Sequence, residues 1–394
     1  MKLFNKKLIL QILGIASILL VIIAIILIIR NMELKQDLKA KNNESNIIDA
    51  DKIENIVKEN SPGVVVIKND EEGIWDKKGE TNLELNHELT IYDENDENKT
   101  FFQTVRAGSD DQGNIYIHEL MSGKIKKFSK KGDYLTTIGR KGSGPWEFLN
   151  NVGWIFSERD SMFILDGGSQ RLNYFTNKGQ YLKSFQLTRP IKVTFTGFVR
   201  NNENYFYVSF YDADNDKVIH KYDASGKHII SFGMPVQFKQ PMKPENYMIK
   251  SSVSHGRLAT VKDGIYYTQV NPYEIRKYSF SGKLKMIIFR KNSFMPPIKI
   301  EHDSGGDRLY VPVFSSMIGI WDEKVINCVI NPGHIQSKFG CVVDVFSLNG
   351  NLLTSFYLKD RIRFYSIDQE GRLYGTIRKE EEPEKVVCYK LKNI

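Results

Sequence analysis

The Gly-rich stretch 139–148, GRKGSGPWEF, brings basic, aromatic and acidic side chains together within ten residues. Such a group could grip a peptide, a glycan or an anion at the lip of a binding site. The alternative is a structural turn, in which Trp146 and Phe148 pack beneath the glycines and Arg140 is merely solvated. The candidate ligand-binding residues of this stretch are Arg140, Lys141, Trp146 and Glu147.

Asp166 and Arg171 form a second charged pair a short distance along the chain, on either side of a turn that contains two glycines. The two side chains could build a salt-bridged ligand site. Asp side chains also commonly brace turns by accepting hydrogen bonds from nearby backbone amides. Both interpretations remain open for this pair.

The acidic run DADND places Asp212, Asp214 and Asp216 at alternate positions, as at the start of a calcium-binding loop. The match is poor afterwards, because Lys217 stands where such loops need glycine and Asp223 where they need a bidentate glutamate. The run is therefore a weak calcium candidate, and a solvated hairpin tip explains it as well.

The region 314–340 is longer than the corresponding part of the other repeats, and long connections in compact folds tend to be functional. We predict here a long loop that carries the candidate ligand-binding residues Trp321, Asp322 and His334. Two of the three cysteines, Cys328 and Cys341, flank this loop and could form a disulfide outside the cytoplasm. A buried thiol is an equal alternative for Cys341.

Signals for catalysis are missing from the sequence. None of the seven histidines pairs with another at metal-ligand spacing, and Ser143 lacks the strand-turn-helix context of a reactive serine. No catalytic residue and no cofactor are predicted, although residues from separate repeats could still converge on a site.

The chain is organised by a repeat whose best copy is IKKFSKKG, from Ile125 to Gly132. Each copy holds an apolar residue, an aromatic residue three positions later and, in all but the last copy, a glycine four positions after that. A period near 45 residues indicates one supersecondary unit per copy. The aromatic positions are Phe128, Phe175, Tyr222, Tyr278, Phe346 and Tyr389.

Each unit resolves into four short apolar runs separated by polar turns, which is typical of the blade of a β-propeller. The second unit shows this pattern between Val152 and Phe185. In the fifth unit, we predict the second strand at Leu309 to Val313. The sequence therefore predicts an all-β, six-bladed β-propeller.

The sixth unit has room for only three strands, so its fourth must come from elsewhere. The apolar run from Glu88 to Tyr92 precedes the first blade and can supply it, which would leave no blade edge bare. A further apolar run, Val64 to Ile67, has no predicted place. In such a ring, the loops between blades and those between second and third strands share one face, where binding is expected.

The Gly139 to Phe148 passage, the strand Met162 to Leu165, Asp166 and the run SQRLNYFTNKG together resemble NHL-type and TolB-like six-bladed propellers of bacteria. The resemblance covers most of residues 86–394, but the full signature occurs once. Gly233 to Pro235 keeps only a remnant of it. The resemblance implies a propeller whose task is more often binding than catalysis.

The N-terminal segment Leu8 to Ile29 is apolar and uncharged over 22 residues, enough to span a bilayer as a helix. It is too long for the apolar region of a cleaved signal peptide, which favours a signal anchor within residues 1–30. The flanking charges do not decide its orientation. The usual layout of a signal anchor places the long body outside the cytoplasm. Residues 31–62 read as a polar tether with a short amphipathic helix, and residues 63–394 as the propeller.

The net charge of +8 gives no case for nucleic-acid binding, because four of the positive charges lie before residue 31. The expected partners are the membrane, through residues 8–29, and an unidentified protein, peptide or glycan ligand. The sequence thus predicts a membrane-anchored extracytoplasmic propeller that binds a ligand on its loop-bearing face. The alternative is a propeller hydrolase or lyase with a metal ion in the central channel.

Overall fold

The structure is a computed structural model that describes most of the chain from residue 50 onward. It separates into two compact units. The larger lies within residues 47–298 and 311–394, and the described part of the smaller is a hairpin of β19 (Lys299–Asp303) and β20 (Gly306–Tyr310). The residues left out are 1–49, 81, 102–103, 120–121, 150–151, 158–160, 192–196, 239–246, 255, 270–272, 292–298, 304–305, 311–313, 332–338 and 379–381.

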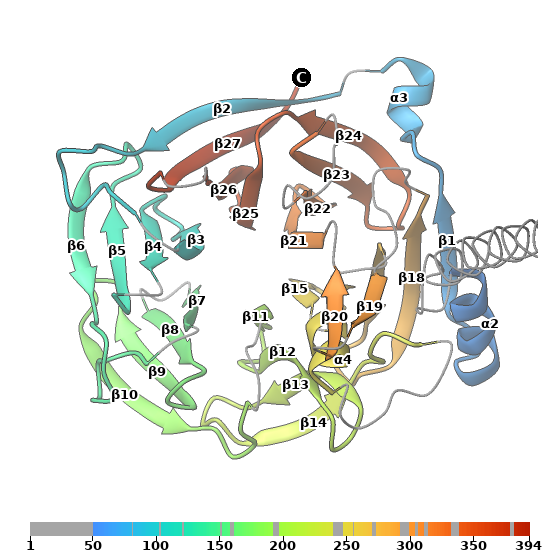
Figure 1. Ribbon diagram of the computed structural model, residues 1–394, viewed down its shortest axis with the longest axis horizontal. Helices are drawn as coiled ribbons and strands as arrows, with labels where there is room; N and C mark the ends of the chain where they lie inside the picture. The colour runs from blue at the N-terminus through green and yellow to red at the C-terminus, as the bar shows by residue number, and fades with distance from the viewer. Residues whose placement is uncertain are drawn as a thin grey trace, which may run out of the picture. The chain divides into compact units, whose positions relative to one another are not determined.

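The larger unit is a ring of six sheets, each built on antiparallel strands that run from the inside outward (Figure 1). The strands of the first five blades are consecutive in the chain, whereas the outermost strand of the sixth comes from before the first blade. This confirms the predicted six-bladed propeller. Blade one holds β3 (Thr104–Ser109), β4 (Ile115–Glu119), β5 (Lys124–Phe128) and β6 (Tyr134–Ile138). Blade two holds β7 (Val152–Ser157), β8 (Ser161–Asp166), β9 (Arg171–Thr176) and β10 (Tyr181–Gln186). Blade three holds β11 (Gly197–Arg200), β12 (Phe206–Asp212), β13 (Lys217–Tyr222) and β14 (His228–Phe232).

The remaining blades keep the same order. Blade four holds β15 (Gly256–Val261), β16 (Gly264–Gln269), β17 (Glu274–Tyr278) and β18 (Leu284–Arg290), and helix α4 (Tyr247–Ser254) precedes it. Blade five holds β21 (Phe314–Trp321), β22 (Lys324–Ile330), β23 (Cys341–Ser347) and β24 (Leu352–Leu358). Blade six holds β25 (Ile362–Ile367), β26 (Arg372–Ile377), β27 (Lys385–Asn393) and, as its outermost strand, β2 (Leu83–Ile91).

The repeat is the third strand of each blade together with the turn that follows it. Its aromatic residue is buried in each of the first five blades, as with Phe128 and Phe346, which have no exposed surface. The glycine adopts a left-handed conformation, with φ of 86° at Gly132 and 86° at Gly350, which a side chain would strain. Asn393 replaces glycine in the sixth copy because β27 continues there and pairs with Leu83 of β2.

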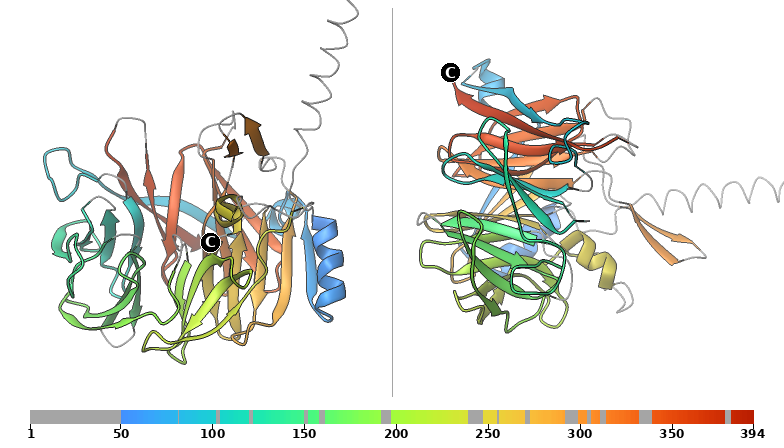
Figure 2. Two further views of the ribbon diagram at one scale, coloured as in Figure 1. Left: turned by 60° about the horizontal axis from the view of Figure 1, so that its bottom comes forward. Right: turned by 90° about the vertical axis from the view of Figure 1, so that its left-hand side faces the viewer.

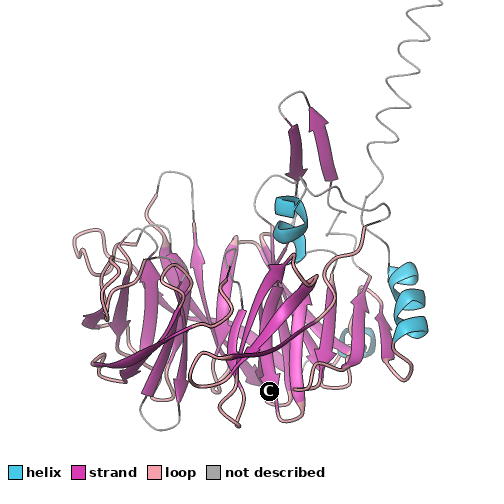
Figure 3. Cartoon of the chain, turned by 90° about the horizontal axis from the view of Figure 1, so that it is seen from below, coloured by secondary structure: helices cyan, strands magenta, loops and turns pink. Residues whose placement is uncertain are grey.

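The core lies between neighbouring blades, because each sheet has two faces to bury. Blade one contributes Tyr116 and Ile125 to a cluster that also holds Met162 and Phe175 of blade two. Strands therefore run between the two faces of the propeller while loops gather at both faces (Figure 3). The loops are therefore less constrained in sequence than the strands, whose side chains form the core.

Ring closure follows the prediction, with a different strand boundary. We expected the closing strand at Glu88 to Tyr92, whereas β2 begins at Leu83 and pairs with β27 along its whole length. Pairing a strand from before the first blade with the last blade removes a bare edge that could otherwise recruit other chains.

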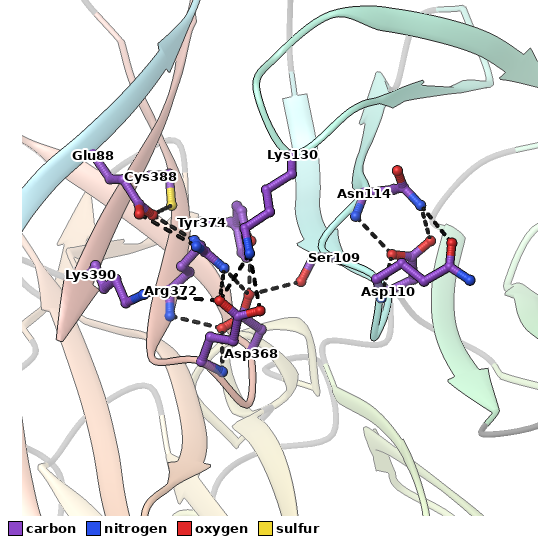
Figure 4. Close-up of polar contacts among 12 residues, drawn as sticks. Glu88, Ser109, Asp110, Asn114, Lys130, Asp368, Arg372, Tyr374, Cys388 and Lys390 are labelled. Atoms are coloured by element: carbon purple, nitrogen blue, oxygen red, sulfur yellow. Dashed lines mark hydrogen bonds and ion pairs between the residues drawn. The ribbon is translucent and has the colours of Figure 1, made fainter. Parts of the chain in front are cut away.

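Charged side chains reinforce the seam between blades six and one (Figure 4). Arg372 lies between Glu88 of the closing strand and Glu370, and Lys130 of blade one reaches Glu370 at 3.1 Å. In the same seam, Asp368 accepts hydrogen bonds from Tyr374 at 2.9 Å and from Ser109 of blade one at 3.2 Å. The closing strand is thus held by ion pairs as well as by the backbone ladder.

The segment before the closing strand runs along the outside of the ring. Helix α2 (Ala50–Asn60) lies in the segment where a short amphipathic helix was predicted, and it buries Ile53 and Val57 against blade four (Figure 2). Strand β1 (Val65–Asn69) then pairs parallel with β18 as a fifth strand of blade four, which places the unassigned run Val64 to Ile67. The short helix α3 (Ile74–Lys78) follows and contacts blade five through Asp76 and Thr354.

The fifth blade departs from the prediction. Its second strand is β22 (Lys324–Ile330) and not Leu309 to Val313, because the hairpin β19–β20 is inserted before the blade begins. The predicted long loop 314–340 is also wrong for most of its length, since residues 314–330 form the first two strands of the blade. The run Leu309 to Val313, predicted as the second strand of this blade, begins within β20 of the insertion.

The predicted membrane anchor, residues 8–29, lies outside the described residues. Among the helices that the structure describes, none is long and apolar enough to cross a membrane.

Candidate functional site

The Gly-rich stretch 139–148 is a self-contained turn between blades one and two. Glu147 holds it together, because its carboxylate accepts hydrogen bonds from Arg140 Nε at 2.7 Å and from the Gly144 amide at 2.9 Å. These two contacts, the amide first, lower the pKa of Glu147. Arg140 in turn lies over the Trp146 ring, 4.4 Å from its centroid. In this predicted binding stretch, Arg140 and Glu147 therefore interact with each other.

The two aromatic residues of this turn have different environments. Phe148 is fully buried and packs against Phe175, with 6.0 Å between the ring centroids. Trp146 is 43% exposed. The structural alternative, which placed both rings beneath the turn, thus holds for Phe148 and is wrong for Trp146.

Asp166 and Arg171 connect the turn to blade two. Asp166 is fully buried and accepts hydrogen bonds from the amides of Leu149 at 3.0 Å and Gly168 at 2.9 Å. Arg171 donates to the carbonyl oxygen of Ser143 at 3.0 Å. These contacts favour the bracing role for both residues. They also bring the candidates of both stretches together on one face.

That face carries the loops between blades and the loops between second and third strands, and we call it the junction face. Trp321 and Asp322 do not lie on it, because they form the turn between the first and second strands of blade five. Trp321 is buried, and Asp322 accepts hydrogen bonds from Lys324 at 2.7 Å and Asn393 at 2.9 Å. The structure therefore separates them from the other candidates. His334 lies outside the described residues.

The aspartates at the end of β12 and in the turn that follows it interact with basic side chains of the protein itself. Asp212 is buried and accepts a hydrogen bond from Arg189 Nε at 2.7 Å. Asp216 accepts hydrogen bonds from Lys250 at 2.5 Å and from the Tyr211 hydroxyl at 2.9 Å. Among the described residues, no group of three or more His, Cys, Asp or Glu side chains is arranged to hold a metal ion. This geometry favours an ion-paired turn over a calcium loop.

Cys328 and Cys341 are free thiols in the structure. They lie on the paired strands β22 and β23, offset by two positions, because Cys328 pairs with Val343 and Cys341 with Ile330. Burial raises the pKa of both thiols. The buried thiol that we weighed for Cys341 is thus what the structure describes.

Three arginines on innermost strands were not predicted from the sequence as site residues: Arg106 of β3, Arg257 of β15 and Arg363 of β25. Arg106 and Arg257 line the cavity of the central channel. Each of the three occupies the second or third position of the innermost strand of its blade. Every innermost strand begins at the junction face, since the chain arrives there from the previous blade. The three guanidinium groups therefore share one end of the channel, the end that opens on the junction face.

The three arginines are close enough to influence each other's ionisation. Burial, followed by the guanidinium groups of Arg363 and Arg106, lowers the pKa of Arg257 to about 9. Burial and Arg363 lower the pKa of Arg106 to about 10. Blades one and four lie on opposite sides of the ring, so the coupling of Arg106 and Arg257 acts across the channel. Like charges held together in this way favour the arrival of an anion.

Aromatic rings hold Arg363 at the channel mouth. Its guanidinium lies 5.8 Å from the centroid of Phe314 and 5.5 Å from that of Tyr365. Its Nε is buried and has no hydrogen-bond partner among the described residues. A buried donor without a partner usually marks the place of a water molecule or a ligand.

The groups around Tyr365 indicate which charges are present at the junction-face end of the channel. Burial raises the pKa of Tyr365, Arg363 and Arg257 lower it, and the carboxylate of Glu384 raises it. His118, which pairs with Arg106 in the ladder, adds no charge, because burial and Arg106 lower its pKa to about 3. Among the described groups that act on Tyr365 or on these arginines, guanidinium groups therefore outnumber carboxylates.

The channel behind the arginines is a cavity of about 310 Å³. This volume is at the small end of ligand pockets in proteins. Further along the innermost strands its wall becomes aliphatic, with partly exposed Val199, Ile320 and Ile367. The site therefore joins a cationic mouth to an apolar interior.

A signal for the arginines existed in the sequence. The innermost strands read TVRAGS, GRLATV and IRFYSI, and each has an arginine near its start in an otherwise mostly apolar segment. Aligning the repeats on their first strands would have shown this, whereas alignment on the third strands did not.

Comparisons with known proteins agree with the fold. The model of the DUF5128 family, described as a 6-bladed beta-propeller, matches residues 97–292. No curated protein matches the chain. A solved structure of a Bacteroides fragilis protein described as exported aligns with a TM-score of 0.52 at 10% identity, over 84% of this chain and 100% of that one. A member of the DUF4221 family from Bacteroides vulgatus aligns with a TM-score of 0.52 at 13% identity, over 79% of this chain and 99% of that one.

These findings define the class: the chain is a six-bladed β-propeller. Identities this low carry the fold alone. They do not extend to the narrower NHL-type or TolB-like resemblance.

Proposed function

We propose that this protein is a membrane-anchored, extracytoplasmic binding module whose channel mouth takes an anionic ligand. The observation that carries the proposal is the placement of Arg106, Arg257 and Arg363 near the junction-face ends of three innermost strands, with Arg106 and Arg257 lining the channel cavity. Guanidinium groups bind carboxylate and phosphate oxygens through two parallel hydrogen bonds, and they do so most strongly where water is partly excluded.

Two considerations support the location outside the cytoplasm. The apolar segment 8–29 predicts an anchor that precedes a long folded body. One of the structurally similar proteins, from Bacteroides fragilis, is described as exported. The narrower resemblance to NHL-type and TolB-like propellers, based on Gly139 to Gly179, fits a binding role as well.

The alternative of a metal-dependent hydrolase or lyase is less well supported. The charged residues that line the described part of the channel are arginines, which repel a metal cation. The channel lining that the structure describes includes no histidine, cysteine or carboxylate.

Isothermal titration of the full chain in detergent micelles with inorganic phosphate and with citrate tests the proposal. We expect at least one of these anions to bind, and we expect Arg257→Gln to weaken that binding by roughly 10- to 100-fold, as for the loss of a charged hydrogen-bond partner.

Arg200→Gln is the matched control, because Arg200 also belongs to an innermost strand but ends β11 at the opposite face. It should leave binding unchanged. If neither anion binds the unaltered chain, or if both variants behave alike, the channel mouth is not an anion site.

A further inference from the structure

The arrangement of the three arginines bears on the kind of anion that the channel takes, and this inference rests on the proposed function. Arg106 and Arg257 come from opposite blades, and Arg363 comes from the blade next to Arg106. A group bound among them is approached from several sides. A planar carboxylate offers two oxygens in one plane, whereas a terminal phosphate offers three oxygens arranged around an axis.

The charge of the site leads to the same choice. Three guanidinium groups act on one another or on Tyr365 at this end of the channel, and among the described residues the carboxylate that acts with them on Tyr365 is that of Glu384. A phosphate monoester carries close to two negative charges at neutral pH, because its second pKa is about 6. A carboxylate or a sulfate ester carries a single negative charge, so the same guanidinium groups attract it less strongly.

The cavity has room for more than the anionic group. Its volume of about 310 Å³ extends from the arginines towards the aliphatic wall formed by Val199, Ile320 and Ile367. An apolar or ring-shaped body attached to the phosphate would bury its surface against this wall. A free inorganic phosphate ion would leave that surface unused.

We propose that the channel binds the dianionic phosphate group of a small phosphomonoester, with the phosphate between Arg106, Arg257 and Arg363 and the organic part directed into the channel. The ligand fills the mouth from the junction face. Arg363, held between Phe314 and Tyr365, turns its unpaired Nε towards this ligand.

Three matched probes separate the phosphate from other anions: phenyl phosphate, phenyl sulfate and benzoate, titrated into the full chain in detergent at pH 7.5. All share a phenyl ring and differ in charge and shape. We expect phenyl phosphate to bind at least about tenfold more tightly than the two singly charged probes, which corresponds to about 1.4 kcal/mol. Inorganic phosphate should bind more weakly than phenyl phosphate, because it lacks the ring.

Measuring the same binding at a lower pH provides a second test. Lowering the pH from 7.5 to 5.5 protonates phenyl phosphate, whose second pKa lies near 6, but leaves phenyl sulfate unchanged. Binding of phenyl phosphate should fall about fourfold or more over this range, and binding of phenyl sulfate should stay constant. Equal affinity for all three probes overturns the phosphomonoester assignment while leaving the anion site in place.

Two variants test where in the channel the probe binds. Ile320→Asp places a charge in the aliphatic wall, and it should weaken phenyl phosphate much more than inorganic phosphate. Arg363→Gln should weaken both by roughly 10- to 100-fold. If Ile320→Asp affects both ligands equally, the organic part does not enter the channel. If no phosphate-containing probe binds and citrate binds, the site takes carboxylates; if nothing binds, the proposed function fails with it.

Discussion

Glu88 and Arg372 are 284 residues apart in sequence, yet Arg372 Nε donates to the Glu88 carboxylate at 2.6 Å. Glu88 belongs to the closing strand β2, Arg372 begins β26, and β27 runs between them. The pair therefore spans three strands at the one place where the ring is joined from two distant parts of the chain. Arg372 is almost buried there, whereas Glu88 is 38% exposed, so solvent screens part of their attraction.

We expect Glu88→Gln to lower the free energy of unfolding by about 1 kcal/mol, because Arg372 loses its partner on the closing strand and keeps Glu370 and the more distant Asp368. Urea unfolding of the full chain in detergent measures this. Glu84→Gln is the control, since Glu84 belongs to the same strand but reaches only the exposed Lys392 at 3.9 Å. Equal losses for the two variants would show that the seam gains nothing from its ion pair.

The channel arginines should lower the stability of the ligand-free protein. Burial and like charges lower the pKa of Arg257, so the charged side chain is less favourable in the folded state than in the unfolded state. Arg257→Gln should therefore raise the free energy of unfolding by about 1 kcal/mol while weakening anion binding.

The measurement is urea unfolding with and without phenyl phosphate. The ligand should stabilise the unaltered chain and have little effect on Arg257→Gln. A destabilised Arg257→Gln variant would show that this arginine is primarily structural.

Stability should fall as the pH drops below about 6.5, in part because of His220. This residue is buried, stacks on Phe210 and hydrogen-bonds to Ser231 at 2.8 Å, and burial lowers its pKa to about 3. The unfolded chain binds the proton near pH 6.5, so the stabilising effect is complete above that pH and is lost as the pH falls towards 3.

Each such histidine contributes a slope of up to about 1.4 kcal/mol per pH unit in this window. His220→Gln should flatten the profile between pH 6.5 and 4.5 relative to the unaltered chain, at some cost in stability at pH 7. His87→Gln is the control, because His87 is exposed on β2. Identical profiles for all three chains would exclude His220 as the cause.

The two aromatic residues of the Gly-rich turn should respond differently to truncation. Phe148→Ala removes a fully buried ring and should cost about 3–5 kcal/mol. Trp146→Ala removes an exposed ring and should cost less than about 1 kcal/mol, mostly its contact with Arg140. Because the proposed ligand site is the channel, Trp146→Ala should not change phenyl phosphate binding. A large loss of binding would move the site to the rim.

The thiols provide a direct test of the disulfide that the sequence allowed. We expect the native chain to react slowly with a thiol reagent, since Cys328, Cys341 and Cys388 are all buried, and the denatured chain to show three thiols. A single thiol after denaturation without reductant would mean that Cys328 and Cys341 are bridged.

Most of the fold could be predicted because propeller blades repeat. The buried aromatic residue and the left-handed glycine are required in every third strand and its turn, so they recur in the sequence. Blade five was misread because its insertion, β19–β20, interrupts the period and carries its own strand pattern. The place of Val64 to Ile67 was not predictable, since a parallel fifth strand on blade four depends on contacts formed across more than 200 residues.

The site was harder to predict for a related reason. Arg106, Arg257 and Arg363 are each an ordinary arginine in a short strand, and only the ring brings them together. The stretch 139–148 holds charges that are close together in sequence, as a binding site can, but Arg140 and Glu147 bind each other. Charged residues that are adjacent in a turn are often paired with each other. A site in a propeller of six repeats instead takes one residue from each of several blades, which are far apart in sequence.

The pairing of β2 with β27 also sets a time order for folding. Leu83 emerges early in synthesis, but its partner Asn393 appears about 300 residues later, or roughly 15–60 seconds at ordinary rates of translation. Until then β2 is a strand without a neighbour, and a waiting strand of this kind is prone to pair with other chains. The last step of folding is therefore the meeting of the two most distant parts of the propeller. A chaperone that shields residues 83–91 during this delay would raise the yield of closed rings more than one that acts on any single blade.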